Sequence, residues 1–552
     1  MSQKPRKPIV PKVSRRDFLR YSATATGGAV MLPSTAWAYA PSSAKPTIKP
    51  WTIPKFYPVE HRDVIVVGSG FGGAITAHRL TAHGVNVTLI EQGRRWDKPL
   101  AAGETRFSKN LYPDGRSTWL CNTTVTPLGP PLPINKTTGV LQGRQLAGKT
   151  VLNGAAYGGG SIAYGGILAK PEEHIFKQVF PTEISYQEMQ RHYDTVGRML
   201  GRGTIPNDVL KTDPFTHVRV ARDQCDKAGL EWELIPTATN WDIVRQELAG
   251  TIPPSITQGE AIYGVNSGAK GTLDNTYLKL AENTGRLDVR TLHQVQAIGQ
   301  NAAGLYTLNT YQINEAGYIT AYRSFTCKKL FLTAGTVTTT SLLVKAKAKG
   351  TLSKLNAHVG QGWGNNGNVY ALRMAVGEST GKWQGGPPAI GVRDLNNPLG
   401  PLFIEHPQLP LGIDIRSLLY FGIGISPTRG TFRYDNASGD VVIDWPSKDL
   451  GQERINQSLL NTLDKMNQTN GGFTTSALDN FASKVKDDIC YHPVGGCVMG
   501  KAADFFGRIK GYQGLYVNDG SFMPGASGCV NPSFTIAALA ERNIERIIAE
   551  DF

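Results

Sequence analysis

One histidine and one asparagine near the C-terminus stand in contexts that suit chemistry. His492 precedes Pro493, which disfavours helical backbone at the histidine and predicts an extended or turn segment, and two glycines follow. Asn531 precedes Pro532 and is expected to cap the last helix, whose N-terminus is a positive pole. An imidazole can exchange a proton with a substrate, and such a pole can stabilise developing negative charge. Taken alone, His492 is also explained as a structural histidine and Asn531 as a simple cap.

The N-terminal part of the chain contains a strand, a glycine turn, a helix, a second strand and an acid, in that order. A β-branched run ends at Val67 and is followed at once by G-x-G-x-x-G at residues 68–73. A helix-compatible stretch and another apolar run come next, and this run ends at Glu91, 23 residues after the first glycine. This order predicts a Rossmann-type dinucleotide site. The residues expected to contact the cofactor are Gly68, Gly70, Phe71, Gly72, Gly73 and Glu91.

Each part of this fingerprint has a mechanical reason. Gly68 would make the tight turn, Gly70 would let the backbone approach a pyrophosphate, and Gly73 would let the helix pack close to the strand. The helix N-terminus offers free N–H groups to phosphate. Glu91 can accept both hydroxyls of an adenosine ribose, which favours an unphosphorylated ribose but does not separate NAD from FAD.

Later glycine loops favour the flavin. Residues 158–161 and 165–166 form glycine-rich stretches far from the first fingerprint, and a flat isoalloxazine ring would need such close backbone contact. A pair of structural turns is the alternative explanation. Short strand-like runs at residues 330–335 and 515–520 each end in a glycine turn. The sheet of the nucleotide domain is therefore expected to be assembled from discontinuous segments.

Composition excludes several classes of protein. The chain has 552 residues, 40% hydrophobic and 18% charged, which argues against intrinsic disorder. No apolar run reaches the ~18 residues that a membrane-spanning helix needs. The formal charge is +14, of which residues 1–38 contribute +6, and the remaining +8 is spread thinly. We therefore expect no nucleic-acid binding, while loose attachment to an anionic lipid surface remains compatible with this charge.

The N-terminus resembles an export signal. Arg15 and Arg16 precede a mildly apolar stretch, and Ala36-Trp37-Ala38 forms an A-x-A cleavage pattern. Together these features are typical of the twin-arginine pathway, which exports folded proteins. We expect cleavage after Ala38 and a periplasmic or secreted location; a disordered basic tail is the alternative. The six cysteines form no C-x-x-C pair, so buried free thiols are expected and disulfides are optional.

Several motifs, taken together and in order, resemble one family, the glucose–methanol–choline (GMC) flavin oxidoreductases, and within it the bacterial sterol oxidases. The resemblance runs from about Asp63 to Ile548. Its main motifs are residues 66–73, 158–161 and 491–497, with further likeness at residues 291–295, 362–368, 519–521 and 542–548.

The resemblance implies catalytic roles at three positions. His492 would lie near the reactive edge of the flavin and position or deprotonate the substrate hydroxyl. Asn531 would touch the flavin and gate access of oxygen or substrate. Glu405, in the run Leu402–Glu405, would move a proton from C4 to C6 of a sterol after oxidation. A surface acid is the alternative for Glu405. A carboxylate in an apolar steroid pocket would have a raised pKa, as a proton shuttle requires.

The resemblance also extends the set of cofactor-contacting residues. These additional residues are Gly160, Ser161, Tyr164, Gly165, Ile167, Val295, Asp519 and Gly520. Departures from the family pattern occur nearby. Tyr164 replaces an asparagine and is expected to reshape the flavin edge, and Ser533 replaces a phenylalanine. His406 follows Glu405 where an apolar residue is usual, and strand alternation would turn it away from Glu405. The stretch 128–140 is shorter than the substrate-covering loop of the family.

The implied fold combines α/β and α+β parts: a discontinuous Rossmann-like FAD-binding domain, and a substrate domain built on a mixed or antiparallel sheet covered by helices. The expected segments are a signal peptide at 1–38, an extended lead-in at 39–58, the FAD-binding domain at 59–97, 271–360 and 506–552, and the substrate-binding domain at 98–270 and 361–505.

The implied function is FAD-dependent oxidation of a 3β-hydroxysteroid to the ketone. Oxygen would be reduced to hydrogen peroxide, and isomerisation of the 5-ene to the 4-en-3-one would follow. We expect a monomer with transient membrane-surface contact and no metal. A dehydrogenase of another bulky alcohol that uses a quinone or cytochrome is the main alternative. A non-catalytic lipid-binding flavoprotein and an NAD-dependent dehydrogenase are the others.

Overall fold

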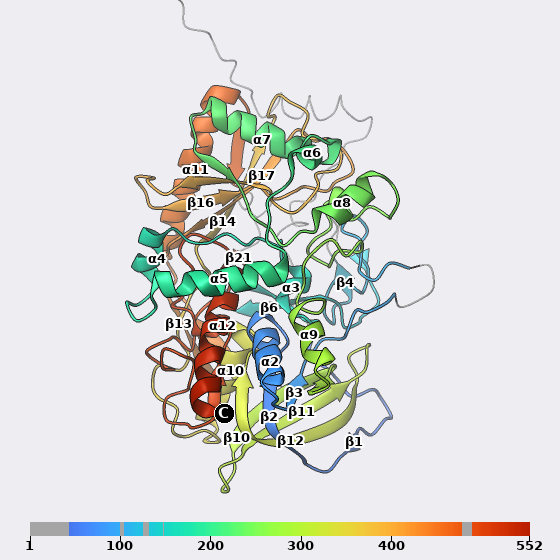
Figure 1. Cartoon of the computed structure of the whole chain (residues 1–552), viewed down its shortest axis with the longest axis vertical. Helices are drawn as coiled ribbons and strands as arrows, with labels where there is room; N and C mark the ends of the chain where they lie inside the picture. Colours follow the sequence, from blue (N-terminus) through green and yellow to red (C-terminus); the bar gives the residue numbers. More distant parts are fainter. Residues whose placement is uncertain (1–43, 100–103, 125–131, 147, 477–487) are drawn as a thin grey trace, which may run out of the picture.

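The computed structural model describes residues 44–99, 104–124, 132–146, 148–476 and 488–552. The expected export signal at residues 1–38 lies outside them, as does part of the stretch 128–140. The described chain forms an elongated molecule with one sheet system at each end (Figure 1). Among the described residues, no helix is both long and apolar enough to cross a membrane.

The first sheet has eight strands drawn from three distant parts of the chain. Five of them follow the parallel order β22-β12-β2-β3-β9, and β10 and β11 extend β12 as antiparallel strands. The strands are β1 (Lys55–Phe56), β2 (Glu60–Val67), β3 (Val87–Ile90), β9 (Leu287–Arg290), β10 (His293–Gln300), β11 (Tyr306–Ile313), β12 (Ile319–Leu332) and β22 (Leu515–Val517). The last four residues of β2 are all buried, as expected for a parallel strand covered on both faces.

Four helices accompany this sheet: α2 (Phe71–Ala82), α9 (Tyr277–Asn283), α10 (Thr336–Ala348) and α12 (Pro532–Asp551). The C-terminal helix α12 packs against α2 and against α5 (Tyr186–Leu200), which crosses the middle of the molecule (Figure 1). The turn η3 (Gly520–Phe522) follows β22 and contacts α10. The last residues of the chain therefore complete the domain that its first strand begins.

The second large sheet is antiparallel throughout. Its order is β20-β14-β17-β16-β15-β8. The strands are β8 (Trp232–Leu234), β14 (Asn368–Met374), β15 (Ile390–Asp394), β16 (Leu402–Glu405), β17 (Leu418–Gly424) and β20 (Phe473–Ser476). Helix α11 (Leu450–Asn470) contacts β14, β16, β17 and β20, and α7 (Thr216–Lys227) contacts β15.

Smaller elements connect the two ends. The hairpin β6 (Leu141–Leu146) and β7 (Lys149–Gly154) is joined by β21 (Asp488–Cys490), and a third sheet has the order β13-β18-β19. Its strands are β13 (Gln361–Trp363), β18 (Gly430–Asp435) and β19 (Asp440–Asp444). The remaining elements are β4 (Thr123–Thr124), β5 (Leu132–Pro133), α3 (Gly160–Ala163), α4 (Glu173–Val179), α6 (Asn207–Leu210), α8 (Trp241–Leu248), η1 (Asp213–Phe215) and η2 (Ile256–Gln258).

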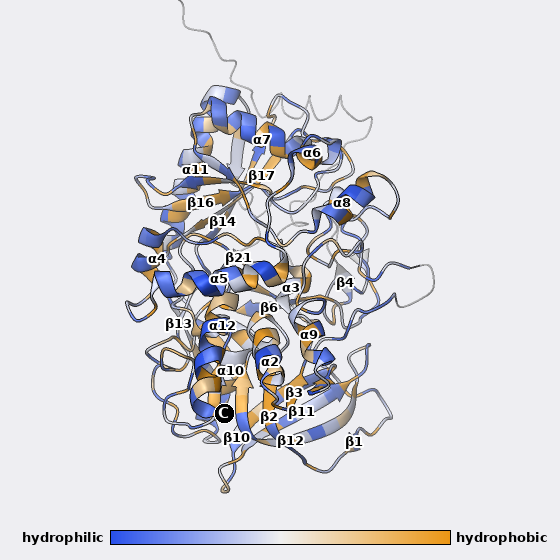
Figure 2. Cartoon of the chain, in the orientation of Figure 1, coloured by the Kyte–Doolittle hydropathy of each residue, from blue (hydrophilic) through white to orange (hydrophobic). Residues whose placement is uncertain are grey.

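Two main hydrophobic cores follow the two large sheets. In Figure 2 β3 and the second half of β2 are strongly apolar, as burial between layers of helix requires. All eight strands of the first sheet except the short β1 lie in the segments predicted for the cofactor domain, 59–97, 271–360 and 506–552. The first core is wider than those segments, however. It also takes in Trp363, Phe432 and Ile443, from a region predicted to bind substrate, because β18 and β19 pack against α10 and β13 pairs with β18. All six cysteines are buried, as the sequence indicated.

Candidate active site

A cavity of about 1520 Å³ extends from the first sheet into the second. It brings together residues from the glycine turn, the second glycine loop, β10, β16 and the start of α12. The predicted site residues that line it are Gly68, Gly70, Phe71, Gly72, Glu91, Gly160, Tyr164, Gly165, Ile167, Val295, Glu405, His492, Asp519, Gly520 and Asn531. Gly73 and Ser161 are not among the lining residues.

The first glycine turn has the geometry that its sequence predicts. Gly68 has a φ of +95°, and an added Cβ would lie 2.5 Å from the Thr333 carbonyl oxygen. A Cβ on Gly72 or Gly73 would overlap backbone oxygens, because α2 lies directly on the neighbouring segments. At Gly70 the space is open: a Cβ there would meet no atom within 4 Å. A cradle of bare backbone at the start of a helix is therefore present, as phosphate binding needs.

The second glycine loop lies against the first. A Cβ on Gly159 would be 2.5 Å from the Cα of Gly70, so side chains are excluded where the two loops meet. Gly160 begins α3 and has open space in front of it. The Ser161 hydroxyl donates to the Gly158 carbonyl at 2.7 Å and accepts from the Leu273 N–H. The Ser161 side chain therefore stabilises the loop through these two hydrogen bonds and does not line the cavity.

Glu91 is buried at the end of β3, with both carboxylate oxygens partly used by the protein. The Ser69 N–H and hydroxyl donate to one oxygen at 3.0 and 2.7 Å, and the Gly93 N–H donates to the other at 2.7 Å. Burial raises the pKa of Glu91, and these donors oppose the rise. The carboxylate is thus held rigidly at the cavity wall, and each oxygen keeps acceptor capacity for a ribose hydroxyl.

Asp519 lines the cavity, but its carboxylate is fully engaged. The Gly335 N–H and the Thr339 hydroxyl donate to one oxygen, and the Ser521 N–H and hydroxyl donate to the other. Burial raises its pKa against these four donors. Asp519 therefore ties the start of α10 to the turn after β22. Its side chain shapes the cavity wall more than it offers a free ligand group.

The three predicted catalytic residues converge at the other end of the cavity. Glu405 is the last residue of β16, His492 follows β21, and Asn531 precedes α12. Glu405 is only 2% exposed, and burial raises its pKa to about 8. The Asn531 side chain is the hydrogen-bonding partner that opposes this rise. The sequence predicted Asn531 as a helix cap, but its side chain makes no capping hydrogen bond. The Asn531 amide is instead turned toward the carboxylate.

His492 is a neutral imidazole. Burial lowers its pKa to about 3, since no acidic side chain offsets the loss of solvent. Its Nδ1 lies 3.0 Å from the amide nitrogen of Asn368, at the start of β14. The Gln452 side chain of α11 donates to the Asn368 carbonyl at 2.5 Å, and this hydrogen bond helps to fix the position of Asn368. The aromatic ring of Phe421 lies 5.4 Å from the imidazole. Asn368 was not identified from the sequence, since nothing in its local pattern shows that the start of β14 lies next to His492.

The departures from the family pattern have clear positions. The Tyr164 hydroxyl donates to the Gly271 carbonyl at 2.6 Å, and its ring contacts Phe71 edge-on at 5.4 Å. Tyr164 is therefore fixed as a flat wall of the cavity. His406 turns away from Glu405 and is not a lining residue. Its ring packs against His217 at 5.0 Å, and burial lowers the pKa of His406 to about 4. The strand alternation expected from the sequence explains this direction.

The residues present fit a flavin dinucleotide. The Gly70 cradle suits a pyrophosphate, Glu91 suits a ribose, and the meeting of Gly70 with Gly159 gives a surface without side chains. A neutral imidazole, a protonatable carboxyl and an amide then stand at the end beyond that surface. Among the described residues, no group of three or more His, Cys, Asp or Glu side chains could hold a metal ion.

Comparisons with known proteins agree with this geometry. Two family models match, described as "GMC oxidoreductase, C-terminal" over residues 366–480 and "GMC oxidoreductase" over residues 435–540. A model described as an NAD(P)-binding Rossmann-like domain matches residues 66–96. A cholesterol oxidase of Mycobacterium tuberculosis is 26% identical over 87% of this chain and 90% of its own length. A cholesterol oxidase of Acinetobacter baumannii is 25% identical over 88% of this chain and 94% of its own length.

Solved structures show the same fold at lower identity. A pyridoxine 4-oxidase from Mesorbium loti aligns with a TM-score of 0.58 and 14% identity, covering 89% of this chain and all of its own. A fungal aryl-alcohol oxidase aligns with a TM-score of 0.60 and 14% identity, covering 89% of this chain and 99% of its own. The two family models and the full-length relatives support the assignment of the chain to the GMC oxidoreductases, a family of flavin-dependent alcohol oxidoreductases.

Proposed function

We propose that this protein oxidises a 3β-hydroxysteroid to the ketone with bound FAD, and that oxygen is the electron acceptor. One observation carries the proposal: a buried carboxyl, Glu405, stands beside Asn531 in the same cavity wall as His492. Alcohol oxidation by itself needs a hydrogen-bonding or basic group at the hydroxyl. A second, carboxyl-based proton carrier suits a substrate whose double bond must move after oxidation. The full-length cholesterol oxidase relatives support this substrate class.

The chain's own residues would prepare the alcohol for oxidation. When bound, the flavin supplies the acceptor for a hydride from the carbinol carbon. His492 is neutral at every pH above about 4, so its ring can hydrogen-bond the substrate hydroxyl and take up its proton. The side chains of Tyr370 and Phe421, stacked 4.6 Å apart beside His492, would cover an apolar ring system and exclude water. Asn531 starts α12, whose positive pole faces the cavity.

Glu405 would then move the proton that shifts the double bond. With its pKa near 8, the carboxyl is balanced between its two forms near neutral pH. As a carboxylate it would remove a proton from C4 of the 5-en-3-one, and as an acid it would return a proton to C6 to give the 4-en-3-one. Atoms balance because one proton leaves and one enters. Burial that raises the pKa of a carboxyl suits such a proton carrier.

A second candidate is dehydrogenation of another bulky alcohol, with a quinone or cytochrome as acceptor. The fixed Tyr164 ring favours it, because this ring changes the shape of the cavity where the family carries a smaller side chain. The two candidates differ in substrate and in acceptor, so a single experiment distinguishes them.

The deciding experiment is anaerobic. The purified yellow protein is mixed with cholesterol under nitrogen, and the flavin absorption band is followed. Bleaching, followed by fast recovery and peroxide formation on admission of air, is the expected result. A band that bleaches but recovers only with a quinone would support the dehydrogenase. A band that does not change with any 3β-hydroxysteroid would overturn the substrate assignment.

The isomerisation step has its own test. We expect Glu405→Gln to keep oxidising the sterol while releasing the unconjugated 5-en-3-one, which lacks the strong ultraviolet absorption of the 4-en-3-one. In the unchanged protein, conjugated product should increase as the pH rises through about 8, because the carboxylate form is the base. If the Gln variant formed the conjugated ketone at the rate of the unchanged protein, Glu405 would have no such role.

Export through the twin-arginine pathway is the accompanying proposal for location. It rests on Arg15, Arg16 and the Ala36–Ala38 cleavage pattern. Because that pathway carries folded proteins, the cofactor would be inserted before transport. We also propose that the enzyme works as a monomer and contacts membrane surfaces only transiently, through its net positive charge.

A further inference from the structure

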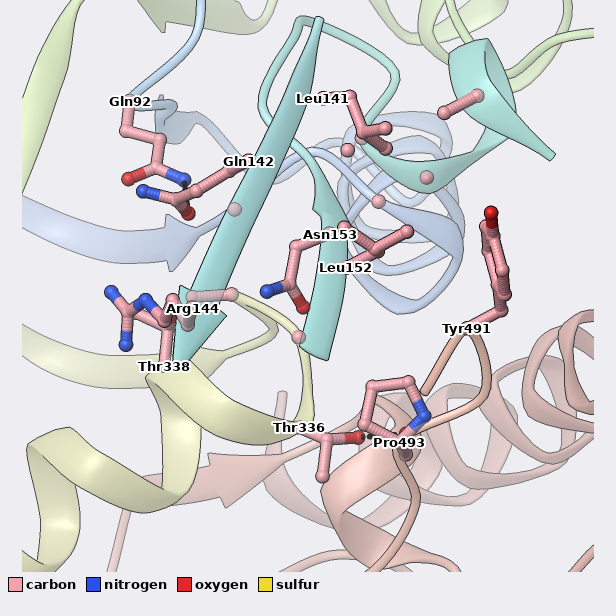
Figure 3. A pocket seen from close by; sticks show the side chains of 18 of the residues that line it. Gln92, Leu141, Gln142, Arg144, Leu152, Asn153, Thr336, Thr338, Tyr491 and Pro493 are labelled. Carbon is pink, nitrogen blue, oxygen red and sulfur yellow. Dashed lines mark hydrogen bonds between the residues drawn. The ribbon is translucent and has the colours of Figure 1, made fainter. Parts of the chain in front are cut away.

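The cavity continues past Glu91, away from the catalytic residues. In a Rossmann-type site the pyrophosphate lies at the helix N-terminus and the acid after the second strand binds the ribose, so the base lies beyond that acid. The next residue, Gln92, fixes which elements enclose this end. Its side chain donates to Gln142 of β6 at 3.1 Å and accepts from Gln294 of β10 at 3.4 Å. Figure 3 shows Gln92 and Gln142 facing each other across the cavity wall.

Arg144 lies two residues further along β6 than Gln142. Because side chains alternate along a strand, both project to the same face, about 7 Å apart. Arg144 lines the cavity near Thr338 at the start of α10 (Figure 3). Burial lowers its pKa, and Asp440 is the charge that opposes this. Yet the Asp440 carboxylate is already bound by Lys45 at 2.7 Å and by the Val441 N–H at 2.9 Å. Within the described part of the chain, the Arg144 guanidinium has no hydrogen bond or ion pair.

The surroundings of Arg144 favour a flat, largely apolar ligand. Apolar side chains from three elements line the same part of the cavity: Val295 of β10, Leu342 of α10, and Val441 and Ile443 of β19. Helix α10 contacts both β10 and β19, so these residues gather around one helix rather than at scattered points of the wall. A guanidinium is planar, weakly hydrated and stacks on aromatic faces. A recess with apolar walls and one planar cation suits a heteroaromatic base.

We propose that Arg144 binds the adenine end of the FAD, so that the β6–β7 hairpin closes the dinucleotide site. The proposal rests on the proposed use of FAD, and it deepens that function by assigning a cofactor-binding residue outside the two glycine loops. Arg144 contacts the base through its planar face and its N–H groups. A cofactor that lacks the adenosine half gains nothing from this residue.

Two flavins and three variants test this assignment without measuring catalysis. The protein is stripped of flavin, and the apoprotein is titrated with FAD and with FMN, using flavin fluorescence. Arg144→Met keeps the aliphatic stem but removes the planar cation, and Arg144→Lys keeps the charge without the plane. Lys349→Met is the control: it removes one positive charge at an exposed position that does not line the cavity.

We expect Arg144→Met to weaken FAD binding about 10-fold and to leave FMN binding unchanged, with Arg144→Lys intermediate and Lys349→Met like the unchanged protein. Equal weakening of FAD and FMN, or no weakening of either, would overturn the assignment. If the apoprotein does not stay folded, the intact holoprotein is heated instead. Flavin release should then precede loss of tryptophan fluorescence in Arg144→Met alone, and simultaneous release and unfolding would contradict the proposal.

Failure of the proposed cofactor would look different. The flavin released from the unchanged protein is identified by chromatography before any titration. If it is not FAD, the cofactor proposal itself fails. If it is FAD and the variants bind it as the unchanged protein does, only the role of Arg144 fails.

Discussion

The Asn368 amide lies 3.0 Å from Nδ1 of His492, and it is a neutral group. Many catalytic histidines are paired with a carboxylate that raises the imidazole pKa. Here the partner carries no charge, and the pKa of His492 is lowered to about 3 by burial. The choice of an amide therefore keeps the imidazole neutral over the whole physiological pH range.

A charge at position 368 should make His492 titrate. In Asn368→Asp the new carboxylate would favour the imidazolium, so the pKa of His492 rises by about 1–3 units. If the neutral ring takes the proton of the substrate hydroxyl, kcat/KM falls on the acid side of this raised pKa. The measurement is the pH profile of kcat/KM, in which the acid limb should move to higher pH.

Asn365→Asp is the matched control. Asn365 lies in the same segment and bonds Gln452 at 2.9 Å, but it does not touch the imidazole. In Asn365→Asp the acid limb of the kcat/KM profile should stay at the same pH as in the unchanged protein. An Asn368→Asp profile that coincides with that of the unchanged protein would show that His492 does not act as a neutral base.

Glu405 should make folding stability depend on pH. Because burial raises its pKa to about 8, the folded protein keeps a proton that the unfolded chain releases near its ordinary value of 4.5. Stability contributed by this proton is fully present below about pH 4.5 and is lost as the pH rises toward 8. Glu405→Gln removes this loss. The melting temperature of Glu405→Gln, relative to that of the unchanged protein, should therefore rise between pH 5 and pH 8. Above pH 8 the difference between the two melting temperatures should stay constant.

Glu453→Gln serves as a control, since Glu453 is an exposed residue in the first turn of α11. This variant should follow the pH dependence of the unchanged protein. Parallel melting curves for Glu405→Gln across the whole range would mean that Glu405 is not protonated in the folded state.

Two neighbouring glycines should fail in different ways when they are replaced by alanine. Gly70 has a φ of −68° and open space at its Cβ position, so Gly70→Ala should fold normally but obstruct the phosphate cradle. In Gly72→Ala the Cβ would overlap the Asn518 carbonyl, which separates α2 from β22. We expect Gly70→Ala to be soluble with little flavin, and Gly72→Ala to be insoluble or to melt at a much lower temperature. Flavin content per folded protein and the melting temperature are the two measurements. Equal behaviour of the two variants would contradict the assignment.

The twin-arginine proposal predicts a sharp effect of a conservative change. Replacing Arg15 and Arg16 with lysines keeps the charge but should stop export, so that precursor with bound flavin accumulates inside the cell. Cell fractionation and N-terminal sequencing of the exported form check this. The mature chain should begin at Tyr39. Undiminished export of the double-lysine variant would contradict the proposal.

The sequence predicted the dinucleotide turn well because its requirements are local. Gly68 has the positive φ of a tight turn, a Cβ on Gly73 would overlap the Gly68 carbonyl, and Gly70 leaves open space where a pyrophosphate could approach. The sequence was less informative about the direction in which a side chain points. Ser161 belongs to the predicted loop, but its hydroxyl points back to Gly158. A motif shows that a serine is present, but which way it points depends on strands and loops far away.

Residues that act through long-range packing were missed. Asn368 reaches His492 across 124 positions of the chain, and Gln92 reaches Gln142 across 50. Neither contact follows from periodicity or composition. The boundary between the two predicted domains was blurred for the same reason, since β18 and β19 pack on α10 although they lie between elements of the second core. The cap at Asn531 illustrates the opposite case, in which a local preference gives way to a tertiary partner.

The pairing of β22 with β12 has a consequence for how the protein is made. A ribosome delivers β2, β3 and α2 early, yet β22 and α12 come last, and Gly72 packs on the backbone just after β22. The wall of the cofactor pocket that β22 and the residues after it form is therefore missing until those residues have been synthesised. A nascent chain that began to cross a membrane in extended form would leave before it could take up its flavin. Synthesis of β22 must therefore precede cofactor loading.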